Sequence, residues 1–112
     1  MATNEELALL IQQGHKEYIS ELWANCYKLL YMLADKIYYA NPDRLAACGY
    51  TQEDLYQGCF FVLLKMIEAY DPEKPFKFTS YAKLHLQNYF RRSVLHYDSE
   101  AKIIKSVLNI SS

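Results

Sequence analysis

Hydrophobic residues recur every three or four positions along most of this chain, which is the spacing of one face of an α-helix. The longest such stretch covers residues 15–40, with its stripe at Ile19, Leu22, Trp23, Cys26, Leu30, Leu33 and Ile37. A shorter stretch precedes it, for which Asn4 is a suitable N-cap and Gly14 a suitable end. The pattern therefore predicts a first helix from residue 4 to residue 14 and a second from residue 15 to residue 40.

A third helix is predicted to begin in the sequence TQED, residues 51–54. Thr51 is a good N-cap, and Asp54 stands three residues later, where a capping box usually has Glu or Gln. The inner face of this helix is formed by apolar residues at helical spacing, namely Leu55, Cys59, Leu63, Met66 and Ile67. The pair Asp71-Pro72 ends the helix, and residues 42–50 before it are expected to form a loop with a short helical turn.

The rest of the chain has a helical pattern as well. A fourth helix is predicted to start at a cap formed by Thr79 or Ser80 and to end near Leu95, with a core face of Ala82, Leu86, Tyr89 or Phe90, and Val94. A last amphipathic segment starts at Ser99 and has the apolar residues Ile103, Ile104, Val107 and Leu108. Because no stretch alternates as a strand does, the predicted fold class is all-α. We expect a compact bundle of four to five helices in one domain, residues 1–112.

The formal net charge of −1 conceals an uneven distribution along the chain. Residues 1–73 hold five Lys/Arg and eleven Asp/Glu, a net of −6, whereas residues 74–105 hold seven Lys/Arg and two Asp/Glu, a net of +5. Such a division suits one surface for a protein partner and another for a polyanion. The acidic N-terminus and the absence of an apolar run of about 18 residues predict a cytoplasmic protein without membrane contact.

No pattern in the sequence indicates a metal, a cofactor or an enzyme. Cys26, Cys48 and Cys59 do not have the spacing of a zinc site, and the three histidines are too scattered to complete one. We interpret the three thiols as small, partly buried core residues in a reducing compartment. The acidic residues form no evident pair around a cleft, and no nucleophile stands next to a base, so the chain is not expected to be catalytic.

The outer side of the fourth helix carries a strip of polar and aromatic residues: Tyr81, His85, Asn88 and Arg91 or Arg92, extended by Lys77, Phe78, Thr79 and Lys83. Cations of this kind neutralise phosphates, and rings stack on unpaired bases. An amide such as that of Asn88 can read the edge of an adenine. The same rings would also suit a helical core. We assign Phe76, Tyr89 and Phe90 to the core, and Phe78 and Tyr81 to a nucleic-acid surface.

The outer face of the third helix holds Asp54, Gln57, Phe61, Leu64 and Lys65. This face is too apolar for a helix side that only meets water. Two interpretations remain open from the pattern alone: the face is a docking site for a protein, or the helix is buried on more than one side.

Residues 54–92, DLYQGCFFVLLKMIEAYDPEKPFKFTSYAKLHLQNYFRR, resemble region 2 of bacterial sigma-70 factors, the promoter-recognition subunits of RNA polymerase. The resemblance implies that Asp54, Leu55, Gln57 and Leu64 dock on the clamp helices of the polymerase β′ subunit. It also implies that the stretch Lys77, Phe78, Thr79 and Tyr81 meets the non-template strand of the melted −10 promoter element, with Tyr81 against a flipped adenine. Asn88, Arg91 and Arg92 would then contact −10 bases or phosphates. An anti-sigma factor joins the candidate partners on the same ground.

The sequence departs from the family pattern at several positions. Leu84-His85 stands where primary sigma factors have two tryptophans, and Gly58 and Phe60 replace polar residues of the docking helix. No second helix-turn-helix domain follows within residues 1–112, so we expect a domain fragment or a truncated relative. Two other interpretations stay open: a sigma-like regulator, for example of a mobile element, that does not initiate transcription, and a helical interaction protein with only a similar fold.

Overall fold

The computed structural model describes residues 2–40, 42–47 and 49–92. Its elements are α1 (Asn4–Gln12), η1 (Lys16–Tyr18), α2 (Ile19–Ala40), α3 (Pro42–Ala47), α4 (Gln52–Ala69) and η2 (Phe78–Tyr81), followed by helical residues 82–92. These described parts contain helices and turns but no strand, which confirms the predicted all-α class. The predicted last amphipathic segment, with Val94 and the expected helix end near Leu95, lies outside the described residues.

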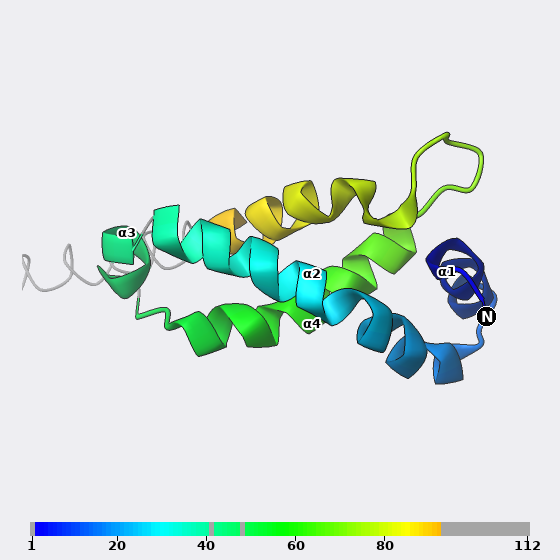
Figure 1. Ribbon diagram of the computed structural model, residues 1–112, viewed down its shortest axis with the longest axis horizontal. Coiled ribbons are helices and arrows are strands. Elements are labelled where there is room, and N and C mark those ends of the chain that lie inside the picture. The colour runs from blue at the N-terminus through cyan, green and yellow to red at the C-terminus, as the bar shows by residue number, and fades with distance from the viewer. Residues whose placement is uncertain (1, 41, 48, 93–112) are drawn as a thin grey trace, which may run out of the picture.

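Two long helices form the frame of the bundle, and a third helical stretch runs along them (Figure 1). α2 and α4 lie side by side, residues 82–92 pack on this pair, and α1 sits at the end next to the loop before η2. Their buried side chains form one core. Its fully buried large members include Leu7 of α1, Leu22 and Leu30 of α2, Leu55 and Leu63 of α4, and Leu86.

The start of α4 agrees closely with the prediction. The hydroxyl of Thr51 accepts the Asp54 N–H at 3.2 Å, and the Asp54 carboxylate accepts the Thr51 N–H at 2.9 Å, so both bonds of a capping box are present. The first helix begins differently, because its N-cap is Thr3, whose hydroxyl accepts the Glu6 N–H at 3.1 Å. Asn4 is therefore the first helical residue and not the cap.

A polar cluster ties α4 to α2 near its N-terminus. The carboxylate of Asp35 accepts hydrogen bonds from Gln52 Nε2, at 2.6 Å, and from the Tyr56 hydroxyl. The hydrogen bond to Asp35 is the main reason that the pKa of Tyr56 is raised to about 12. Tyr56 also stacks on Tyr31, with 4.3 Å between the ring centroids, so the two helices share both a polar and an aromatic contact.

The two described cysteines are core residues, as the sequence suggested. Cys26 and Cys59 are buried free thiols, and burial raises the pKa of Cys59 to about 12 and that of Cys26 to about 11. Within residues 2–40, 42–47 and 49–92, no helix is long and apolar enough to cross a bilayer.

Gly58 marks the closest approach between α4 and the helical stretch 82–92. A Cβ atom added to this glycine would lie 2.8 Å from Cε1 of Tyr89 and 3.0 Å from Cε1 of Phe90. Atoms of a real side chain do not come this close without a shift of their neighbours. Gly58 lowers the helix propensity of α4, but the close packing against Tyr89 and Phe90 leaves no room for a side chain at this position.

Candidate functional site

An exposed, basic loop joins α4 to η2. All of residues 71–77 are exposed, and Lys74 and Lys77 stand in this segment with Pro72 and Pro75. The Asp71 carboxylate accepts the Glu73 N–H at 3.0 Å, and the Asp71 carbonyl accepts the Lys74 N–H at 3.2 Å. These two hydrogen bonds give the loop a defined turn at its start, so its lysines project from an ordered backbone.

The structure reverses the expected roles of two phenylalanines. Phe78, predicted to contact nucleic acid, is only 4% exposed and lies in the core, where its ring centroid is 5.8 Å from that of Tyr70. Phe76, predicted to be core, is 51% exposed and packs edge-to-face on Tyr81, with 5.4 Å between centroids. The prediction of a nucleic-acid contact for the Phe78 side chain is therefore wrong in this conformation.

The start of the fourth helix also differs from its prediction. η2 is preceded by Lys77 and has no side-chain cap of its own, so neither Thr79 nor Ser80 caps the helix. The backbone N–H of Phe78 instead donates a hydrogen bond to the carboxylate of Glu5 in the neighbouring helix α1, at 3.2 Å. Thr79 is half-buried and Ser80 is exposed.

Four residues of the predicted strip line a pocket of about 230 Å³ beside the loop. They are Lys77, Phe78, Tyr81 and His85, which are joined by Phe76, predicted to be core, and by Lys74 and Leu84, which were not among the predicted site residues. Tyr81 is 41% and Leu84 is 51% exposed, so a ring and an aliphatic side chain are open to a ligand here. This site offers an aromatic pair, two ammonium groups and the Asp71 carboxylate at one end of the bundle.

His85 contributes a polar ring and not a cation to this pocket at neutral pH. Burial lowers its pKa below the ordinary value for histidine, so the imidazole is neutral at pH 7. A neutral imidazole can donate one hydrogen bond and accept another, which suits the edge of a base better than a phosphate.

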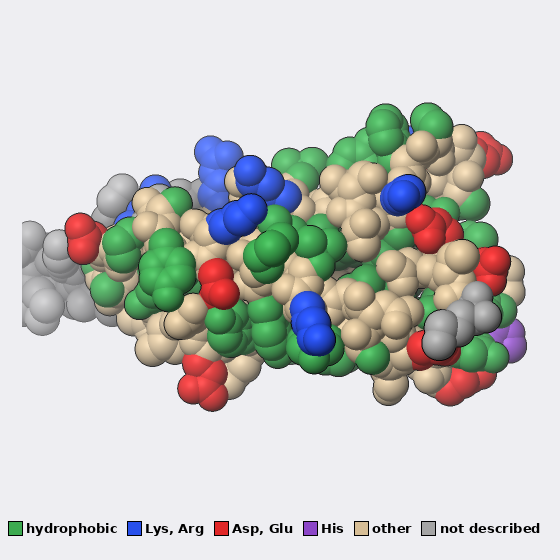
Figure 2. Space-filling model, viewed as in Figure 1, with side chains coloured by type: hydrophobic (Ala, Val, Ile, Leu, Met, Phe, Trp, Pro, Cys, Tyr) green, Lys and Arg blue, Asp and Glu red, His purple; other side chains and the backbone are tan. Residues whose placement is uncertain are grey.

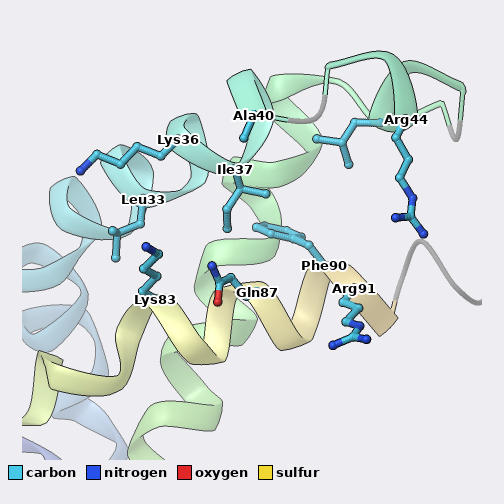
Figure 3. A pocket seen from close by; sticks show the side chains of 10 residues that line it. Leu33, Lys36, Ile37, Ala40, Arg44, Lys83, Gln87, Phe90 and Arg91 are labelled. Atoms are coloured by element: carbon cyan, nitrogen blue, oxygen red, sulfur yellow. The ribbon is translucent and has the colours of Figure 1, made fainter.

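Other predicted residues lie on a different side of the same helix. Lys83 and Arg91 line a larger groove, of about 630 Å³, between residues 82–92, α2 and α3. Figure 3 shows Lys83 and Gln87 pointing toward Leu33 and Ile37 of α2. Lys36 and Arg44 complete the basic rim, and no acidic residue is among the described residues that line the groove. Figure 2 shows Lys and Arg side chains gathered on the face in view over this part of the bundle.

Asn88 and Arg92 are exposed but line neither of these two pockets. The predicted strip of nine residues is therefore divided by the structure. Lys77, Tyr81 and His85 share the loop pocket, Lys83 and Arg91 share the groove, and Phe78 belongs to the core.

The outer face of α4 carries a second exposed surface. Phe61 is 56% exposed, Phe60 is 38% exposed, and Gln57 is exposed beside them, while Leu64 is half-buried. Leu55 is fully buried, so the prediction that its side chain docks on a partner is wrong in this conformation. Asp54 is exposed, and one of its carboxylate oxygens is engaged in the helix cap.

Aromatic rings extend this surface from α4 onto α2. Phe60 packs edge-to-face on Trp23 with 5.5 Å between centroids, and Trp23 in turn lies 5.9 Å from Tyr31. Tyr27 joins the same cluster, at 5.6 Å from Tyr31. An apolar face with partly exposed rings, bordered by Gln57 and Lys65, is typical of a protein-binding surface.

Together these features define a helical binding module with one basic, aromatic site and one apolar helix face. No group of three or more His, Cys, Asp or Glu that could hold a metal ion occurs in the described part of the chain. The chain belongs to the Sigma-70 region 2 family, whose family model matches residues 22–98, more than half of the chain. No curated protein and no solved structure gives a significant match. Domains of this family are non-catalytic transcription-initiation modules that bind RNA polymerase and promoter DNA.

Proposed function

We propose that this domain binds core RNA polymerase and holds the unpaired non-template strand of the −10 promoter element. The observation that carries the proposal is the exposed ring pair of Phe76 and Tyr81, which lies next to Lys77 in a segment covered by the family match. Rings of this kind stack on unpaired bases, and the lysines on the loop neutralise the flanking phosphates. Asn88, Arg91 and Arg92 complete the proposed contacts with DNA, together with Thr79, Lys83 and His85.

In this proposal a base leaves the duplex and packs against Tyr81 in the loop pocket. Tyr81 is already in edge-to-face contact with Phe76, so its ring is held in place before a ligand arrives. The neutral imidazole of His85 lines the same pocket and is available to a base edge. A preformed ring wall lowers the ordering cost of binding.

Replacing Tyr81 by alanine is expected to weaken binding of a single-stranded −10-like oligonucleotide by about 1–3 kcal/mol, because one base loses its stacking partner. Fluorescence anisotropy with a labelled oligonucleotide measures the change. Tyr39→Ala is a matched control, since Tyr39 is 69% exposed at the end of α2 and lines neither pocket. Equal affinities of the Tyr81 and Tyr39 variants would remove Tyr81 from the proposed site.

The second half of the proposal places polymerase on the outer face of α4, on Gln57, Leu64 and the exposed rings of Phe60 and Phe61. Asp54 borders this face. The clamp helices of the β′ subunit are the proposed partner. An aromatic cluster shared by α2 and α4 supports this, because large rings dominate the energetics of protein interfaces.

The double variant Gln57→Ala, Phe61→Ala is expected to lose retention of core RNA polymerase in a pull-down with the immobilised domain. The physical reason is the removal of an exposed anchor ring and its neighbouring amide from the centre of the face. Gln87→Ala, Phe76→Ala removes the same two residue types away from this face, one from the groove and one from the loop pocket, and is expected to retain polymerase. Loss of polymerase with both double variants, or with neither, would contradict the assignment of this face.

A sigma-like regulator that binds polymerase or DNA without initiating transcription is the second candidate function. The observation in its favour is Leu84-His85, which takes the place of the family's tryptophan pair. Leu84 is 51% exposed, but an aliphatic side chain and a half-buried imidazole form a smaller wedge than two indoles. Detection of an open promoter complex with core polymerase distinguishes the two candidates.

A further inference from the structure

The N-terminal helix lies outside the family match, yet it contacts the part of the bundle that carries the loop pocket. The match begins at residue 22, after α1 and η1. α1 packs against α2, α4 and η2, and it buries Leu7 and Ala8 completely in the core. In Figure 1 this helix sits directly beside the loop between α4 and η2.

One end of the loop is fixed by Gln12, near the end of α1. Its Nε2 donates hydrogen bonds to the carbonyl oxygens of Ile67, at 2.7 Å, and Tyr70, at 2.8 Å. These carbonyls lie at the C-terminal end of α4, where the last backbone acceptors have few or no partners within the helix; the Ile67 carbonyl also accepts the Tyr70 N–H at 3.3 Å. Gln12 therefore satisfies the C-terminus of α4 and fixes the point at which the chain leaves it.

The other end of the loop is fixed by Glu5, in the first turn of α1. Its Oε1 accepts the N–H of Phe78 at 3.2 Å, at the residue where η2 begins. No side chain from η2 itself takes this role. The carboxylate thus caps η2, and Tyr81 stands three residues farther on, at the end of the same turn.

We propose that α1 is a positioning element for the strand-binding site, in which Glu5 and Gln12 hold the two ends of loop 71–77 so that Tyr81, Phe76 and Lys77 face the same strand. This inference rests on the proposed function. All seven loop residues are exposed. The Asp71 turn orders the start of the loop from within, and the two anchors hold its ends on the bundle. A loop held in its binding conformation loses less entropy when the ligand binds.

The test compares two double variants with the same change in composition and charge. Glu5→Ala, Gln12→Ala removes both anchors. Glu6→Ala, Gln13→Ala changes the Glu and the Gln that directly follow the two anchors in the sequence. The side chains of Glu6 and Gln13 are exposed and make no hydrogen bond within the described residues. Each protein is assayed for affinity to a single-stranded −10-like oligonucleotide, for amide hydrogen exchange at Phe78, and for retention of core polymerase.

The anchor variant is expected to bind the oligonucleotide about 5- to 30-fold more weakly than the matched variant, the loss expected for about one to two net hydrogen bonds. Removing the negative charge of Glu5 would by itself strengthen binding of the negatively charged oligonucleotide. The expected weakening therefore cannot come from the change in charge. The Phe78 amide is expected to exchange at least about tenfold faster. Retention of polymerase is expected to be the same in both variants, which a general loss of structure would not allow.

Two results would overturn the inference. Faster exchange at Phe78 with unchanged oligonucleotide affinity would mean that the anchors order the loop without serving the site. Unchanged exchange would mean that they do not order it. If the double variant fails to fold, the single variants Glu5→Ala and Gln12→Ala are compared with Glu6→Ala and Gln13→Ala by the same assays.

Failure of the proposed function has a separate signature. If Tyr81→Ala weakens oligonucleotide binding but the anchor variants do not, only the positioning role of α1 is lost. If the unaltered domain does not bind the oligonucleotide, strand capture itself is wrong and the role of α1 in it falls as well.

Discussion

Replacing Phe78 by alanine is expected to lower the free energy of unfolding by about 3–5 kcal/mol. The side chain is 4% exposed and packs in the core with Ala82, Leu86 and Phe90, so its removal leaves a cavity that the surrounding helices cannot close completely. Chemical denaturation followed by circular dichroism measures the change. A loss of this size would identify Phe78 as the residue that holds η2 on the bundle.

Phe76→Ala is the control for this prediction, because Phe76 has the same side chain two residues away and is 51% exposed. Its effect on the free energy of unfolding is expected to stay within about 0.5 kcal/mol, while oligonucleotide binding becomes weaker. A stability loss at Phe76 equal to that at Phe78 would contradict the placement of the two rings.

Gly58→Leu is expected to destabilise the fold by about 3 kcal/mol, at the upper part of the range for overpacked cores. The first added carbon would already lie 2.8 Å from the Tyr89 ring, and the remaining carbons have to occupy the same space. The gain in helix propensity of about 1 kcal/mol offsets only part of the cost. The transition midpoint in urea, at an unchanged slope, measures the effect.

Ala24→Leu serves as the comparison for Gly58→Leu, since Ala24 is exposed in α2 and gains the same side chain on the helix surface and not against the core. It is expected to have almost no effect on stability. A Gly58→Leu protein that is as stable as the Ala24→Leu protein would show that the helical stretch 82–92 moves away from α4 at little cost.

The sequence predicted the elements whose signals are local. The capping box at Thr51 and Asp54 requires only the four residues TQED, and both of its hydrogen bonds are present. The stripe of α2 follows from helical spacing, and three of the four buried residues of this helix, Leu22, Cys26 and Leu30, were predicted, whereas the buried Ala34 was not. The predicted membership of the Sigma-70 region 2 family is also confirmed. It could be predicted because its motif is contiguous in the sequence and can be recognised without knowing how the helices pack.

The errors at the candidate site have a common physical cause, which is tertiary packing around short segments. Phe78, Ala82, Leu86 and Phe90 are four residues apart and all buried, so the helical period could have assigned Phe78 to the core. Leu55 was given a docking role from a resemblance, although its place on the inner stripe of α4 already indicated burial. The anchors Glu5 and Gln12 had no local signal, since their partners are 73 and 55 residues away.

The hydrophobic core of this protein begins before the first residue of the family match. A fragment cut at residue 22 would keep every matched position but would begin inside α2, without Leu7, Ala8 and the hydrogen bonds of α1. Such a fragment would expose apolar surface on α2 and α4 at the end that carries the loop. The segment that the family model matches and the segment whose side chains form the core therefore start at different residues, and the second includes α1.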